Sequence, residues 1–376
     1  MNICIFSLKL NPSHLTQVSG IVQALKNGDN ISLVLSEGFL RYKTIKDAQY
    51  IHKLGRSDNL LQVGIATIKS LFEVRSIKKV YSEIKNSDVF LFQCIHPVNI
   101  HIMWKYRQQK NKKFICWVHE IGELSFEHYS VKQIINLLLN RFLIALTRRF
   151  CDYLILSSNT AEAEYIKIYP QDVDRILRVP LIFLDRQMVS DVKRKYFTFV
   201  GVASKNKGVD IFFDIIKESF YQNKNFFYQI ITRSNITELI NSLPVDSHKF
   251  LKIINKETIC DEEIDTAIRE SIAVLCPARK MIQSAVVPVA YMHSTPVIGS
   301  RVMGLQEQII DGLSGVLIDE YTSPKHWVEK IDKYIDTFEH LSENARNEFN
   351  EKYSVNAARG ILQKTICQKD CVPPLV

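Results

Sequence analysis

A chain of 376 residues is too long for one small core and has the length expected of two domains of ordinary size. Its hydrophobic content of 46%, with 23% charged residues, is typical of globular proteins and excludes extensive disorder. The excess of 48 basic over 40 acidic residues gives a net charge of +8. That charge favours anionic partners such as nucleotide diphosphates, lipid phosphates or nucleic acid.

The sequence contains no apolar stretch long enough to predict a membrane span, which takes about 18 residues without charge. The N-terminus, MNICIFSLKL, has the pattern of a strand rather than of a signal peptide. The eight cysteines are scattered and lack zinc spacing, which is typical of reduced thiols in a cytoplasmic protein. We therefore expect a cytoplasmic protein.

Strand-like and helix-like segments alternate through the first half, a rhythm typical of a parallel sheet covered by helices. We expect strands at residues 2–10, 31–37, 88–94, 113–120 and 152–158, with the segment 175–183 closing this half. We expect helices at residues 13–27, 60–86, 98–110, 131–150 and 159–169, the last opened by Asn159 as its N-cap.

The pattern restarts after a polar linker at residues 185–195. We expect strands at residues 195–202, 226–232, 250–256, 272–278, 295–300 and 315–319. We expect helices at residues 209–220, 236–243, 261–271, 282–293, 305–311, 324–336, 339–351 and 355–369. The predicted fold class is α/β, with two doubly wound, Rossmann-like domains facing a central cleft.

The predicted boundaries are 1–185 for an N-terminal domain and 186–354 for a C-terminal one. Residues 355–376 form a C-terminal helix and tail that could cross back to the first domain. Ligands of doubly wound sheets bind at the carboxyl ends of the strands, so the cleft between the two halves is the expected site.

Two loop-to-helix transitions in the second half carry candidate binding residues. In FTFVGVASKNKGVDIFF, a buried strand ends at Gly201, Lys205 and Lys207 follow, and Gly208 opens a helix. Glycine allows close backbone approach, helix N-termini attract phosphate, and lysines supply point charges. The alternative is an ordinary turn between a strand and a helix, with solvated lysines.

The second transition follows the strand that ends at Pro277. Arg279 and Lys280 precede a helix expected to start near Ile282 to Gln283. Two basic side chains beside a helix N-terminus would form a second corner suited to an anion.

The ordered set of these pieces resembles the C-terminal half of the retaining glycosyltransferases of family 4, which have the GT-B fold. The set comprises FVG…KG, then proline, helix, TPVI, and G-x-x-E-x-I-x-D-G-x-x-G-x-L, within residues 197–317. The resemblance implies donor diphosphate near Gly201 and Lys207, with Glu307 close to the donor. It also implies that His119 of WVHE faces the donor sugar, and that LRVPLIFLD ends the first domain at Asp185.

The sequence departs from that family at the usual donor contacts. Val202 stands where the family has arginine, so Lys205 would have to supply that charge. Met281 and Val289 stand where the family has two glutamates, and neither can accept a hydrogen bond from a hydroxyl. The glycine-rich loop after the first strand is absent, and NPSHLTQ (11–17) replaces it.

His119 and Lys207 are the predicted catalytic residues. The predicted donor-binding residues are Gly201, Lys205, Lys207, Arg279, Lys280, Gln283, Ser284 and Glu307. His14 and Glu120 are predicted on the acceptor side. The alternatives are a structural role for His119, a surface position for His14 and a capping role for Glu307.

The amphipathic segment 131–150 has two interpretations. Burial of its apolar face is the favoured one. Alternatively it offers a basic, apolar surface to an anionic membrane, helped by Arg148, Arg149 and the cluster Lys110, Lys112 and Lys113. A nucleic-acid partner is not expected, because aromatic residues do not interleave with the basic ones.

The predicted function is transfer of a hexosyl or related group from a nucleotide-diphosphate sugar to a saccharide or lipid-linked saccharide. The resemblance implies retention of configuration, no metal, no further cofactor, and a role in surface polysaccharides such as capsule, O-antigen or lipopolysaccharide. The predicted location is cytoplasmic, with peripheral contact at the inner face of the membrane. The alternative is a GT-B protein without turnover that acts as a binding or scaffolding partner of an active transferase.

Overall fold

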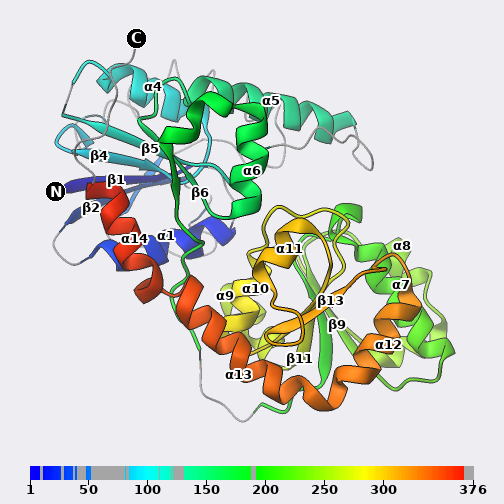
Figure 1. Ribbon diagram of the computed structural model, residues 1–376. Coiled ribbons are helices and arrows are strands. Elements are labelled where there is room, and N and C mark those ends of the chain that lie inside the picture. Colours follow the sequence, from blue (N-terminus) through cyan, green and yellow to red (C-terminus); the bar gives the residue numbers. More distant parts are fainter. Residues whose placement is uncertain are drawn as a thin grey trace. The chain divides into compact units, whose positions relative to one another are not determined.

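The computed structural model describes residues 1–8, 12–26, 29–36, 39, 48–51, 81, 84–109, 111–119, 121, 131–187 and 192–367. The chain divides into two compact units (Figure 1). The first consists of residues 1–184 together with the segment that begins at Val355, and the second of residues 185–354. Each unit has its own parallel sheet and its own core.

The described strands of the first unit form a parallel sheet in the order β3-β2-β1-β4-β5-β6-β7. Their bounds are β1 Asn2–Ser7, β2 Asn30–Ser36, β3 Ala48–Ile51, β4 Val89–Phe92, β5 Lys113–Trp117, β6 Tyr153–Leu156 and β7 Ile176–Arg178. The order reverses between β1 and β4. In an open α/β sheet, that switch point is where the strand ends leave room for a ligand.

Helices cover this sheet. The described ones are α1 Pro12–Leu25, α4 Pro97–Tyr106, α5 Val131–Thr147, α6 Asn159–Ile168 and α14 Val355–Cys367. Helix α14 contacts α1, and both contribute apolar side chains to one core with β1, β4 and β5 (Figure 1). Gly20 of α1 lies so close to Ile182 that a Cβ there would be 2.8 Å from its carbonyl oxygen.

The second unit repeats the same winding with the strand order β10-β9-β8-β11-β12-β13, again parallel throughout. The bounds are β8 Tyr196–Val200, β9 Phe227–Thr232, β10 Leu251–Asn255, β11 Ser271–Cys276, β12 Val297–Ser300 and β13 Gly315–Ile318. The switch point lies between β8 and β11. The two candidate loops identified from the sequence follow these two strands.

The helices of the second unit are mostly short. Their bounds are α7 Val209–Tyr221, α8 Thr237–Asn241, α9 Asp261–Arg269, α10 Val286–Met292, α11 Met303–Gln308, α12 Pro324–Tyr334 and α13 Phe338–Glu348. Helices α7 and α12 pack against each other, and their apolar side chains join the core around Phe197 and Phe212.

The prediction of two doubly wound α/β sheets is confirmed. Strand β3 was not predicted, and most of the helix expected at 60–86 lies outside the described residues. Helix α6 is capped by Ser158 and not by Asn159, because the Ser158 hydroxyl accepts a hydrogen bond from the Ala161 backbone N–H at 3.0 Å.

Helix α10 begins at Val286, four residues later than expected from the sequence. The prediction that the helix starts near Ile282 to Gln283 is therefore wrong. Both residues lie in the loop between β11 and α10, and contacts described below hold that loop out of the helix.

Candidate functional site

The loop between β8 and α7 is shaped by two glycines with positive φ. Gly201 has φ +112 and Gly208 has φ +72, a backbone conformation that residues with a Cβ rarely adopt. Between them, residues Lys205–Lys207 form one short 3-10 turn, in which the Lys207 N–H donates to the Ser204 carbonyl at 3.0 Å. Lys205 and Lys207 are both exposed. The loop therefore presents two ammonium groups at the switch point.

This loop packs directly against the end of β11. A Cβ on Gly208 would lie 1.7 Å from the Pro277 carbonyl oxygen, so only glycine fits there. We call the two segments, residues 201–208 and 277–285, the paired loops. Their close approach brings Lys205 beside Arg279 and Lys207 beside Met281.

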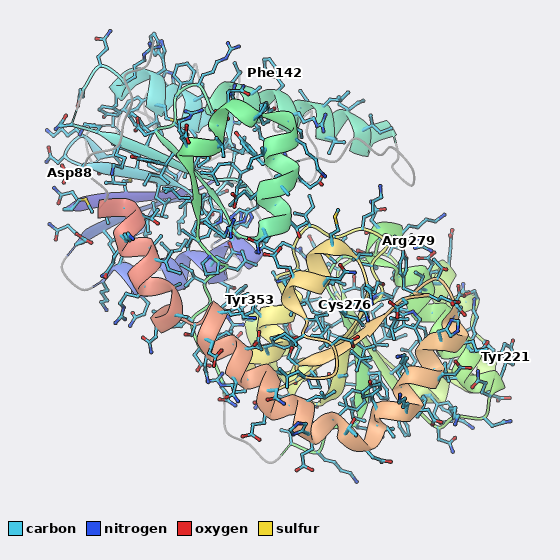
Figure 2. The ribbon with its side chains drawn as sticks, viewed as in Figure 1. Asp88, Phe142, Tyr221, Cys276, Arg279 and Tyr353 are labelled. Atoms are coloured by element: carbon cyan, nitrogen blue, oxygen red, sulfur yellow. The ribbon has the colours of Figure 1, made fainter. Side chains whose placement is uncertain are left out.

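Arg279, which is labelled in Figure 2, binds groups of the other paired loop. Its guanidinium donates to both carboxylate oxygens of Asp210 at 2.7 Å and to the Lys205 carbonyl at 2.7 Å. Its backbone N–H donates to the Asn206 carbonyl at 3.0 Å. Burial raises the pKa of Asp210, but the hydrogen bonds and charge of Arg279 outweigh burial and hold that pKa below its usual range. The guanidinium of Arg279 thus serves mainly to stabilise the paired loops.

The loop between β11 and α10 contains Met281, which stands at the first of the two positions where the resembled family has glutamate. The Lys207 ammonium lies 3.0 Å from the Met281 sulfur. The Met281 carbonyl accepts from the Gly304 N–H at 2.9 Å, and a Cβ on Gly304 would be 2.4 Å from that oxygen. Lys280 is exposed, and Gln283 is half-buried in the same loop.

Ser284 is held by a residue that the sequence did not single out. The Gln308 side chain accepts from the Ser284 N–H at 2.7 Å and donates to the Ser284 carbonyl at 2.9 Å. Ser284 and Gln308 are both buried. The Ser284 hydroxyl also accepts from the backbone N–H of Val286, the first residue of α10, at 3.2 Å. Gln308 directly follows Glu307, so its position beside the G-x-x-E motif was the available signal.

Glu307 lies on α11, half-buried, next to Gln308. Val289, which stands at the second of these two glutamate positions, lies within α10. The second unit thus gathers Gly201, Lys205, Lys207, Arg279, Lys280, Gln283 and Ser284 on the paired loops, with Glu307 on the adjoining helix.

The first unit carries a row of polar side chains at its own switch point. His119 follows β5, and its Nε2 lies 3.0 Å from the side-chain nitrogen of Gln93, which follows β4. The same nitrogen of Gln93 donates to the side-chain oxygen of Gln17 on α1 at 2.7 Å. The His14 ring stacks on the His119 ring with centroids 5.1 Å apart. We call His14, Gln17, Gln93 and His119 the polar row.

His14 is only 5% exposed, so the alternative of a surface position is wrong. His119 is half-buried, and its other side stacks on Trp117 with centroids 5.6 Å apart. The sequence reasoning missed Gln17 and Gln93, which read as isolated polar residues beside apolar ones. Glu120 lies outside the described residues.

The apolar face of α5 is largely exposed. Phe142, which Figure 2 labels on this helix, is 59% exposed. Ile135, Leu138 and Leu139 are exposed as well, while Ile144 is buried. The favoured prediction, that the unit buries this face, is therefore wrong. Among the described residues, no helix is both long and apolar enough to cross a bilayer.

Several of the basic residues expected near this face bind protein groups. Arg148 donates to both carboxylate oxygens of the buried Asp172. Lys112 donates to the carbonyls of Lys85 and Ser87, and Lys113 to that of Ile366. Arg149 is exposed, and Lys110 lies outside the described residues.

Comparison with known proteins finds a family and a fold. Residues 183–351 match the family described as glycosyl transferases group 1. A glycosyltransferase of Methanocaldococcus jannaschii, itself uncharacterised, is 26% identical over 318 residues, which cover 75% of this chain and 88% of the relative.

Two solved structures have similar architectures. Sucrose-phosphate synthase from Thermosynechococcus elongatus has a TM-score of 0.75 at 14% identity, covering 97% of this chain and 98% of that one. The Anabaena protein HepE in complex with UDP has a TM-score of 0.70 at 13% identity, covering 97% and 99%. At such identities the likeness shows the fold. The chain thus has the GT-B fold, and its residues 183–351 are similar to the glycosyl transferases group 1.

Proposed function

We propose that this protein transfers a sugar from a nucleotide-diphosphate donor to a saccharide or lipid-linked saccharide, with retention of configuration and without a metal. The observation that carries the proposal is the position of Lys205, Lys207 and Lys280 in the paired loops, which follow the two strands at the switch point of the second sheet. Cations beside strand ends suit a diphosphate. The binding of UDP by HepE, which has the same fold, supports this choice of ligand.

The proposed role of the paired loops is electrostatic. When the bond between the sugar and the diphosphate breaks, negative charge develops on the departing phosphate oxygen. Fixed cations stabilise that charge without rearranging during the reaction. Lys205, Lys207 and Lys280 would supply the cations, and Arg279 would hold both loops in place. Gln283, Ser284 and Glu307 would bind hydroxyl groups of the donor.

The polar row of the first unit would bind uncharged sugar groups of the donor and the acceptor. His119 would face the donor sugar, and His14 would lie on the acceptor side. Imidazole and amide groups offer the hydrogen-bond donors and acceptors that sugar hydroxyls need. None of these four side chains is a carboxylate or an ammonium, which fits an uncharged polyhydroxylated ligand.

The acceptor would be a growing surface polysaccharide or a lipid-linked sugar, as in capsule, O-antigen or lipopolysaccharide synthesis. The exposed apolar face of α5 and the net charge of +8 support peripheral contact with an anionic membrane. Co-sedimentation with phosphatidylglycerol vesicles, but not with phosphatidylcholine vesicles, is the expected result. Equal recovery with both would contradict the contact.

The test of donor binding is calorimetric titration with UDP and GDP, followed by activity with their sugars. We expect Lys207→Ala to weaken nucleotide binding and to lower kcat/KM by roughly a hundredfold, since it removes one charge from the developing phosphate anion. Lys224→Ala is the matched control, because Lys224 is a surface lysine paired with Asp332. Full activity of Lys207→Ala would remove Lys207 from the mechanism.

A second candidate is a GT-B protein without turnover that binds an active transferase. The observation that favours it is the replacement of two carboxylates by Met281 and Val289. The same titration separates the candidates. Binding of no nucleotide at millimolar concentration would favour the scaffold, whereas micromolar binding with turnover would favour the enzyme.

A further inference from the structure

The polar row contains one buried amide whose nitrogen has two partners. Gln93 is fully buried, and its side-chain nitrogen donates to the side-chain oxygen of Gln17 at 2.7 Å. The same nitrogen lies 3.0 Å from Nε2 of His119. An amide nitrogen carries two N–H groups and accepts no hydrogen bond. Each of the two contacts therefore uses one N–H group of Gln93, and Nε2 of His119 is the acceptor.

The orientation of the Gln93 amide follows from the partners that its atoms find. Its oxygen is buried and has no hydrogen-bond partner among the described residues. If the amide were turned over, its nitrogen would take that place, and two buried N–H groups would lack acceptors. The oxygen would then face the oxygen of Gln17, so that Gln17 would have to turn as well. The observed orientation leaves one acceptor unpaired instead of two donors, and it is the less costly one.

The imidazole ring of His119 is held in one orientation by its neighbours. It stacks on the His14 ring with 29° between the planes and on the Trp117 ring with 13°. The Trp117 ring is itself fixed, because its Nε1–H donates to the Ser157 hydroxyl at 2.6 Å. Turning the imidazole over within the stack would put a carbon in the place of Nε2 and would lose the hydrogen bond from Gln93.

We propose that Gln93 is a positioning residue that sets the tautomer of His119, with the proton on Nδ1 and a lone pair on Nε2. A neutral imidazole carries one proton, so a nitrogen that accepts a hydrogen bond leaves the proton to the other nitrogen. A proton on Nε2 would set its N–H group against an N–H group of Gln93. The bond from Gln93 to Gln17 holds the amide in place, so protein groups alone determine the tautomer.

The consequence for catalysis rests on the proposed function. With its proton on Nδ1, His119 is a hydrogen-bond donor at that nitrogen, and its Nε2 is engaged by Gln93. A general base needs a nitrogen that can take a proton from the reacting group. His119 would therefore act in the reaction as a donor to oxygen and not as a base.

The first experiment locates the proton by NMR in protein with isotopically labelled histidine, without nucleotide and at about pH 8, where ordinary histidines are neutral. Correlations between the ring nitrogens and the ring protons distinguish a protonated nitrogen from an unprotonated one. The signals of His119 are assigned by their loss in His119→Asn. We expect an unprotonated Nε2 in the wild type. A protonated Nε2 in the wild type would overturn the proposal without recourse to any variant.

Two isosteric substitutions test whether Gln93 sets this tautomer. Gln93→Glu replaces the donating nitrogen by an oxygen that accepts, so we expect a proton to appear on Nε2 of His119. Gln17→Glu is the matched control, because it also buries a carboxylate in the polar row but keeps an accepting oxygen beside Gln93. The tautomer in Gln17→Glu should be that of the wild type. An unprotonated Nε2 in Gln93→Glu would show that Gln93 does not determine the tautomer.

The second experiment tests the consequence for the reaction. We expect Gln93→Glu to lower kcat by roughly tenfold while its affinity for UDP stays within about twofold of the wild type. Gln109→Glu, at an exposed position, should change neither. An unchanged kcat in a Gln93→Glu protein that carries the proton on Nε2 would overturn the consequence. A wild type that transfers no sugar from any nucleotide donor would defeat the proposed function, whereas the spectra would still decide the tautomer. Thermal melting of each variant confirms that it is folded.

Discussion

The two switch points of this protein are built from different chemistry. At the second sheet, the paired loops combine lysines with an arginine that binds Asp210 and the backbone of the neighbouring loop. At the first sheet, the polar row combines two histidines with two glutamines and contains no carboxylate or ammonium. The same strand order thus carries basic side chains in one unit and neutral hydrogen-bonding side chains in the other.

Under the proposed function, the two switch points would bind groups of different charge. A nucleotide-diphosphate sugar has a charged end and a neutral end rich in hydroxyls. Charge-based binding is strong but salt-dependent, whereas neutral hydrogen bonds give direction and specificity. The proposed assignment of the diphosphate to the second unit can be tested separately from the role of the polar row in the first.

The largest effect is expected at Gly208, where the paired loops touch. Gly208→Ala would place a Cβ 1.7 Å from the Pro277 carbonyl oxygen at a φ of +72. We expect a loss of about 4 kcal/mol in the free energy of unfolding, together with loss of nucleotide binding. Gly201→Ala is the matched control: its φ is +112 but no atom lies within 4 Å, so we expect about 2 kcal/mol from backbone strain alone. Urea denaturation measures both, and equal losses would show that the loops do not depend on their close approach.

A smaller effect, confined to turnover, is expected in the polar row. Gln93→Leu removes the bonds to His119 and Gln17 and should lower kcat by roughly tenfold to a hundredfold through misplacement of His119. The affinity for UDP should not change, because the diphosphate is assigned to the other unit. Gln109→Leu, at an exposed position after α4, is the control. A loss of UDP affinity as large as that of Lys207→Ala would break the division between the units.

The smallest effect is expected when the pH is lowered and Asp210, the partner of Arg279, becomes protonated. The pKa of Asp210 is lower in the folded protein than its usual value because of Arg279, so protonation favours the unfolded state. The contribution of Asp210 is complete above about pH 4 and is lost as the pH falls through the folded pKa. We expect the difference in unfolding free energy between wild type and Asp210→Asn to be about 1 kcal/mol at pH 7 and to vanish at lower pH. A difference that persists at pH 2 would assign the stabilisation to something other than the charge.

Much of the fold could be predicted because each strand of a parallel sheet is a continuous apolar run. VFLF and YLIL are short, buried on both faces and bounded by polar residues. Strand β3, AQYI, lies at the edge of the described sheet and has only two large apolar residues, so its pattern was too weak. The start of α10 was missed because Gln308 and Gly304, both distant in sequence, hold residues 281–284 in a loop.

The site was predictable where glycines and charges mark it and not where it depends on burial. Gly201 and Gly208 stand out because a turn with positive φ needs glycine, and the lysines between them carry visible charge. Gln93 and Gln308 do not stand out, since a buried glutamine looks like any other glutamine until its partner is known. The burial of His14 could not be predicted for the same reason, because its ring stacks on that of His119, which lies far away in the sequence.

Helix α14 gives the first unit an unusual dependence on the order of synthesis. Val355, Ala358, Leu362 and Ile366 belong to the same core as β1 and α1. The second unit is one continuous stretch, residues 185–354, and all of it leaves the ribosome before this helix does. Domains generally fold as units during translation. We therefore expect the unit that begins the chain to finish folding last, with α1 waiting for its partner until translation has passed residue 366.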